Sequence, residues 1–211
     1  MLLSTAYFPP LSWLALAARD FRPGFPPAVI GLEACENYQK QSYRNRCYIL
    51  ASDGVQMLQV PVVHGASWAI RDVEVDYSTP WVVRTQRALD TAYETSAYYE
   101  YYRDEVFALL DARPQTLWEL NLSTIRFLMK KTGIACELSP TAGFIGPDSE
   151  ADDYRFSLHP KRSDTVLADL GLDRPYYQVF RDRMGGFTPN LSCLDLLFNE
   201  GPDSIMWLKK I

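Results

Sequence analysis

The sequence predicts an α/β fold: a βαβ opening with a mostly parallel sheet, a β-hairpin and a helical middle region. Three observations predict it. Two apolar runs of strand length flank a helix-forming segment near the N-terminus, an Asp-Gly pair separates two β-rich segments, and helical periodicity dominates from about residue 78 to residue 133. Because the composition does not change sharply along residues 1–211, we interpret them as a single domain.

The first 33 residues have the pattern of a βαβ unit. Residues 2–7 are mainly apolar and end before Pro9 and Pro10, so they predict a short buried strand. Residues 12–18 are rich in helix formers, and the apolar run 28–33 predicts a second strand. Strands joined through a helix in this way are parallel, and their crossover is right-handed.

A hairpin is expected further along the chain. Residues 47–51 and 55–63 are β-rich, and Ser52-Asp53-Gly54 between them is a short turn signal. Pro61 lacks an amide proton and is therefore expected near the end of the hairpin or on a sheet edge.

Three helices follow in the middle region. The periodicity predicts helices over residues 81–93 and 98–112, the second ending before Pro114. A third helix starts at Thr116, where Thr-x-x-Glu forms a capping box with Glu119, and it ends near Lys131 and Gly133.

The C-terminal third contains weaker signals. Residues 136–144 are expected to return to the sheet, and residues 163–170 to form a short helix. A last helix is predicted over residues 194–199, with Ser192 as its N-cap and Asp195 at the N3 position completing the cap.

Composition excludes several classes of protein. The net charge is −5, so nothing draws the chain to a phosphate backbone and we expect no nucleic-acid partner. The N-terminus has no basic region and its apolar run breaks at Pro9, which argues against a signal peptide and against membrane insertion. The four cysteines show no CxxC spacing, so we expect a reduced, cytoplasmic protein.

Cofactor motifs are also missing. The chain has two histidines, His64 and His159, which is too few for a multi-histidine metal site. Neither common phosphate-binding loop occurs, so we expect no metal and no cofactor.

The most unusual segment is Glu36–Arg46, which follows the second predicted strand. It combines cations, tyrosines and side-chain amides within eleven residues. Arginine grips phosphate or carboxylate, lysine adds a point charge, amides select hydroxyls and tyrosine faces stack. Ligands of open α/β sheets bind beyond the carboxyl ends of the strands, where this segment is expected. An ordinary solvated loop is the alternative.

Other residues offer weaker possibilities. Glu33, Glu36 or Asp53 could supply a general base, although Asp53 is better explained by its turn. His64 titrates near neutrality and could serve as a base or be structural. The segment 159–162 could add positive charge to a phosphate site or be an exposed loop.

Two further groups have alternative interpretations. Five tyrosines between Tyr93 and Tyr102 could hold a sugar or a base, or could simply pack in the core. Asn190 to Asp195 could present polar groups to a ligand, although helix capping is their first expected role.

Several motifs together resemble the WbqC-like protein family. Tyr7-Phe8-Pro9-Pro10 resembles its aromatic-proline opening, and Asn37–Arg46, with Arg-Asn-Arg at its end, looks like its signature. Gln59-Val60-Pro61-Val62 resembles its Val-Pro-Val strand, and Pro189-Asn190-Leu191-Ser192 resembles part of its C-terminal block. The resemblance covers about residues 4–204, but Thr5-Ala6 replaces the usual Gln-Pro and leaves the substrate open.

The resemblance implies a role in surface-polysaccharide (O-antigen type) biosynthesis, as a transferase that adds an aminoacyl or acyl group to a nucleotide sugar or glycan. A non-catalytic sugar- or nucleotide-binding or scaffolding protein of the same pathway is the alternative. The expected partner is a small anionic ligand, a nucleotide sugar or an activated acyl donor, and the oligomeric state is open, with a homo-oligomer possible. Glu36 and His64 are the candidate catalytic residues, and the candidate substrate-binding residues are Tyr7, Asn37, Tyr38, Lys40, Arg44, Asn45, Arg46 and Asn190.

Overall fold

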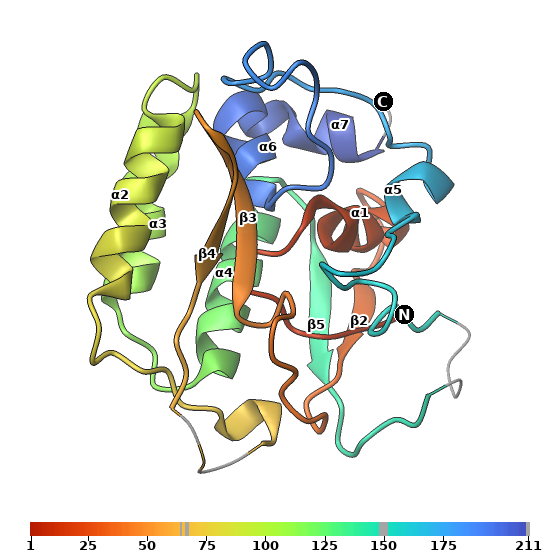
Figure 1. Ribbon diagram of the computed structural model, residues 1–211. Helices are drawn as coiled ribbons and strands as arrows, with labels where there is room; N and C mark the ends of the chain where they lie inside the picture. Colours follow the sequence, from red (N-terminus) through yellow and green to blue (C-terminus); the bar gives the residue numbers. More distant parts are fainter. Residues whose placement is uncertain (64, 66–67, 148–151, 210–211) are drawn as a thin grey trace.

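The computed structural model describes residues 1–63, 65, 68–147 and 152–209, and it has the predicted α/β architecture (Figure 1). Strands β1 (Leu2–Leu3), β2 (Ala28–Leu32) and β5 (Cys136–Pro140) form a parallel sheet in the order β1-β2-β5. Helix α1 (Leu11–Asp20) connects β1 to β2, so the βαβ opening is confirmed.

Strand β1 is shorter than predicted. The run 2–7 leaves the sheet after Leu3, because the next backbone groups bond elsewhere. The Ser4 carbonyl accepts from the Trp13 indole at 3.0 Å, and the Tyr7 amide donates to the Tyr43 carbonyl at 2.9 Å. The apolar run is therefore buried without being strand throughout.

The hairpin consists of β3 (Arg46–Ala51) and β4 (Gly54–Gln59), which pair antiparallel from Ala51–Gly54 at the turn to Arg46–Gln59 at the open end. Strand β4 stops before the predicted end at residue 63. The Val60 amide instead bonds the Asn45 carbonyl at 2.9 Å, and Pro61 has no amide proton to continue the ladder.

The helical middle region contains α2 (Trp81–Tyr93), α3 (Tyr99–Asp111) and α4 (Leu117–Lys131). The capping box is confirmed: Thr116 Oγ1 accepts from the Glu119 amide, and Glu119 Oε2 accepts from the Thr116 amide, each at 3.2 Å. Helices α2 and α3 lie on one side of the hairpin, and the parallel sheet lies on the other (Figure 1).

The C-terminal third has α5 (Val166–Asp169), α6 (Cys193–Glu200) and α7 (Ser204–Lys209), with short 3-10 turns at Ile70–Asp72 and Gly201–Asp203. Ser192 caps α6 as predicted, accepting from the Leu194 amide. The capping role predicted for Asp195 is wrong, because its carboxylate accepts from the Tyr93 and Tyr176 hydroxyls at 2.8 and 2.5 Å.

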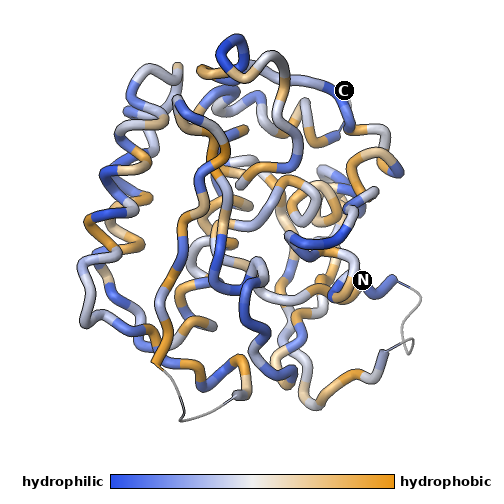
Figure 2. The backbone as a smooth tube through the Cα atoms, viewed as in Figure 1, coloured by the Kyte–Doolittle hydropathy of each residue, from blue (hydrophilic) through white to orange (hydrophobic). Residues whose placement is uncertain are grey.

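The core surrounds α1, in which every residue from Leu11 to Ala18 is buried. The chain connecting β2 to β3 is largely hydrophilic by contrast (Figure 2). Tyr93 and Tyr99 pack against Phe198, each with ring centroids at 4.9 Å, so these two tyrosines belong to the core. No helix within the described ranges is long and apolar enough to cross a bilayer.

Candidate functional site

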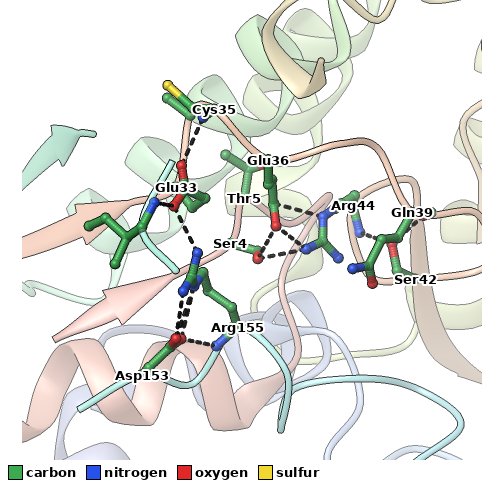
Figure 3. Close-up of polar contacts among 12 residues, drawn as sticks. Ser4, Thr5, Glu33, Cys35, Glu36, Gln39, Ser42, Arg44, Asp153 and Arg155 are labelled. Atoms are coloured by element: carbon green, nitrogen blue, oxygen red, sulfur yellow. Dashed lines mark hydrogen bonds and ion pairs between the residues drawn. The ribbon is translucent and has the colours of Figure 1, made fainter. Parts of the chain in front are cut away.

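Two buried ion pairs lie where the chain leaves β1 and β2 (Figure 3). Glu33 directly follows β2, and its carboxylate accepts from Arg155 Nη1 at 2.8 Å. Both side chains are completely buried. Arg155 also binds Asp153 at 2.7 Å, and together these contacts join the segment around residue 155 to the edge of the sheet.

The second pair joins Glu36 to Arg44. Arg44 Nε donates to Glu36 Oε1 at 2.8 Å and Arg44 Nη2 donates to Glu36 Oε2 at 2.5 Å, while the Ser4 hydroxyl bonds both partners (Figure 3). The Arg44 carbonyl accepts from Asn121 on α4 at 2.8 Å. These contacts close the segment between residues 36 and 44 into a fixed loop.

Beside this loop, at the open end of the hairpin, lies a cavity of about 280 Å³, which we call the hairpin-base cavity. Four of the predicted substrate-binding residues line it: Tyr38, Lys40, Asn45 and Arg46. The rest of its lining is Gln41, Gln59, Pro61, Val62 and Asp76.

The fold positions these side chains through backbone contacts. Arg46 is the first residue of β3 and pairs with Gln59, the last residue of β4. Asn45 is 2% exposed, and its side-chain amide donates to the Val60 carbonyl at 2.9 Å. The Tyr38 amide bonds the Trp68 carbonyl, which fixes the opposite wall.

The cavity has an excess of positive charge. Lys40 and Arg46 contribute two cations and Asp76 one carboxylate. Within the described part of the chain, no carboxylate lies within ion-pair distance of either cation. Lys40 Nζ lies 5.5 Å from the centre of the exposed Trp68 ring. Burial raises the pKa of Tyr38, although Arg46 and Arg44 oppose the shift, so its hydroxyl stays neutral.

Two buried polar atoms in the wall, Asn45 Oδ1 and Arg46 Nε, lack a hydrogen-bond partner within the described ranges. An unpaired buried polar atom destabilises the folded protein. A hydrogen-bond donor of a bound ligand would remove this destabilisation after a small movement of the Asn45 side chain.

Lys161 approaches this cavity from the C-terminal third. Its ammonium donates to the Gln41 side-chain carbonyl. Lys161 and Arg162 are exposed, and the Lys161 ammonium lies next to Gln41 of the cavity lining. Burial lowers the pKa of His159, and Arg162 and Arg44 add to the shift.

The other predicted residues lie elsewhere. Asn37 is exposed and forms a backbone bridge to Ala69. Tyr7 is fully buried, with its ring edge-on to Trp81 at 6.5 Å. Asn190 adopts φ 53°, accepts from the Ser12 amide at 2.9 Å and donates to Asp164 at 2.7 Å. His64 lies outside the described residues.

The predicted site residues omit five members of the lining: Gln41, Gln59, Pro61, Val62 and Asp76. Gln59, Pro61 and Val62 belong to the Gln59-Val60-Pro61-Val62 stretch noted above, and Gln41 to the segment Glu36–Arg46, so a signal existed for these four. The sequence offers no signal for Asp76, because this residue follows the hairpin in the chain and only folding brings it to the cavity. Among the described residues no group of three histidine, cysteine or acidic side chains could hold a metal ion.

The cavity and its supporting loop belong to a region that is recognisable across a protein family. The model of the WbqC-like protein family matches residues 29–162, which include the loop, the hairpin and the cavity. The chain therefore belongs to the WbqC-like protein family.

A curated relative gives no further description of activity. The chain is 27% identical over 194 residues to the uncharacterized protein Rv1507c of Mycobacterium tuberculosis (strain ATCC 25618 / H37Rv), covering 82% of this chain and 84% of the relative. No solved structure matches the chain.

Proposed function

We propose that this protein binds a nucleotide sugar in the hairpin-base cavity and transfers an aminoacyl or acyl group to its sugar, in surface-polysaccharide biosynthesis. The observation that carries the proposal is that Tyr38, Lys40, Asn45 and Arg46, from one short segment, converge on one cavity with excess positive charge.

Each side chain has a distinct role in this proposal. Lys40 and Arg46 bind the phosphate oxygens, Arg46 through two parallel hydrogen bonds and Lys40 as a point charge. Asn45 and Gln59 provide amides for hydroxyl groups, and Tyr38 presents an aromatic face. Lys40 and Arg46 have no ion-pair partner among the described residues, so each can hold an oxygen of a ligand with more than one negative charge.

In the transfer step an amine or hydroxyl of the sugar attacks the carbonyl carbon of an activated acyl donor, a thioester or an ester, whose thiol or alcohol leaves with a proton. A base removes the proton of the attacking group. Glu36 is poorly suited, because both of its oxygens accept from Arg44 and it is 5% exposed. We assign that role to Asp76, the carboxylate in the cavity lining. His64 stays a candidate from the sequence. In this scheme Glu36 and Arg44 are positioning residues.

A non-catalytic binding protein is the second candidate. The observation that favours it is that Arg44 binds both oxygens of Glu36, the carboxylate within the segment that supplies Tyr38, Lys40, Asn45 and Arg46. Such a protein would bind the same ligand without turning it over.

Thermal-shift measurements with nucleotide sugars, nucleotides, free sugars and amino acids test the proposal. A ligand that binds only the folded state raises the unfolding midpoint. We expect stabilisation by nucleotide sugars, lost in Arg46→Gln and retained in Arg22→Gln, which alters an exposed arginine away from the cavity. Product formation by mass spectrometry then separates the two candidates. Stabilisation by free sugars alone, or an unchanged response in Arg46→Gln, would contradict the proposal.

A further inference from the structure

A second cavity, of about 260 Å³, adjoins the hairpin-base cavity. The two cavities share the lining residues Gln59 and Pro61. The second cavity lies between β4 and the first turns of α2, which runs beside the hairpin (Figure 1). We call it the α2 cavity.

The lining of the α2 cavity differs from that of its neighbour. Arg84 is its one charged lining residue, and no acidic side chain lines it among the described residues. Arg84 is exposed, and the ion pairs of the described chain do not include it. A single unneutralised arginine suits a ligand with one negative charge.

The deeper wall is preformed. Trp81 and Thr85 are both 4% exposed and lie on the same side of α2. The Trp81 indole N–H has no acceptor among the residues that the structure describes. Tyr7 packs edge-on behind Trp81 at 6.5 Å and supports it. The cavity thus combines a fixed apolar wall with a cation at its mouth, as small-molecule sites do.

We propose that the α2 cavity is a binding site for a small carboxylic acid or amino acid, with its carboxylate on Arg84. A free carboxylate has no leaving group, so this ligand is not the acyl donor of the transfer reaction. Gln56 and Thr79 offer further polar contacts.

The test uses two probes that differ in charge, N-acetylalanine and its neutral amide, titrated into isotope-labelled protein and followed by two-dimensional NMR. The reporter is the Trp81 indole N–H signal, assigned with Trp81→Phe. We expect it to shift saturably with the acid but not with the amide. In Arg84→Gln the affinity should fall at least tenfold. Arg87→Gln, an exposed arginine on the same helix that does not line the cavity, should leave it unchanged.

Three results would overturn the proposal: equal shifts with acid and amide, unchanged affinity in Arg84→Gln, or an Arg84-dependent shift that is stronger with pyrophosphate than with the acid. A parallel titration with UDP-glucose separates it from the proposed function. UDP-glucose binding without carboxylate binding would refute the α2-cavity assignment alone. Carboxylate binding without UDP-glucose binding would refute the nucleotide-sugar proposal alone.

Discussion

Glu36 and Arg44 are eight residues apart and form a bidentate ion pair with both side chains almost fully buried. The pair closes the loop that presents Tyr38 and Lys40 on one flank and Asn45 and Arg46 on the other. Two residues that the sequence suggested for direct chemistry are thus paired with each other.

Replacing one partner of the Glu36–Arg44 ion pair should therefore lower the free energy of unfolding more than replacing both. In Arg44→Gln the Glu36 carboxylate stays buried without its cation, and we expect a loss of about 3–5 kcal/mol in the free energy of unfolding. The double variant Glu36→Gln, Arg44→Gln should be more stable than Arg44→Gln alone. Urea denaturation measures both. Losses that simply add would contradict a coupled pair.

Asp76 and Glu36 should differ in their effects on turnover. If Asp76 is the base, Asp76→Asn should lower the transfer rate by about 10²–10⁴-fold while nucleotide-sugar affinity changes little. The variant Glu36→Gln should instead weaken both ligand binding and the stability of the folded protein. Rate and affinity measured on the same preparations distinguish the two. An active Asp76→Asn enzyme would remove Asp76 from the mechanism.

Gly201 ends α6 at a position that only glycine fits. Its φ is +54°, and a Cβ there would lie 2.5 Å from the Tyr98 ring. Gly201→Ala should destabilise the protein by roughly 2 kcal/mol or more. Gly133→Ala is the matched control, since Gly133 has φ +73° but open space around it, and its cost should be about 1 kcal/mol. Equal losses would mean that the contact with Tyr98 is unimportant.

Asp195 should make stability depend on pH. Burial raises its pKa above the ordinary value, although hydrogen bonds from Tyr176, Gln178 and Tyr93 oppose the shift. A raised pKa means that the folded state binds the proton more tightly than the unfolded state. The resulting stabilisation is complete below the unfolded pKa and is lost as pH rises through the folded pKa.

The difference in unfolding free energy between the wild type and Asp195→Asn isolates this group. It should shift against the wild type as pH rises above the ordinary pKa of an aspartate, and become constant above the raised pKa of the folded state. Urea unfolding at several pH values gives the curve. A constant difference across that range would show that the carboxyl does not titrate differently in the two states.

Local signals explain why much of the fold was predictable. The capping box at Thr116 and Glu119, the helical period of 81–93 and the Asp53-Gly54 turn are each decided by neighbouring residues. The end of β1 after Leu3 was not, because Tyr7 takes a distant partner, the Tyr43 carbonyl. Asp195 likewise occupies a normal capping position, and only tertiary contacts with Tyr93 and Tyr176 reassign its carboxylate.

The candidate site likewise contains some residues that the sequence predicts and others that it does not. The sequence placed Lys40, Asn45 and Arg46 in one unusual segment, and they share one cavity. It could not distinguish Arg44 from Arg46, although burial pairs Arg44 with Glu36 and leaves Arg46 at the cavity. Asp76 and Arg84 carry no local signal, since each reaches its cavity only through packing around the hairpin.

Calorimetric titration of UDP-glucose tests the central claim most directly. The variant Lys40→Gln, Arg46→Gln removes both cations of the hairpin-base cavity, and Arg22→Gln, Arg183→Gln removes two exposed cations elsewhere, so both carry the same net charge. Charge-assisted hydrogen bonds contribute about 1.5–3 kcal/mol each, so we predict an affinity loss of at least about 100-fold in the first variant only. Equal affinity in the two variants would contradict binding at the hairpin-base cavity.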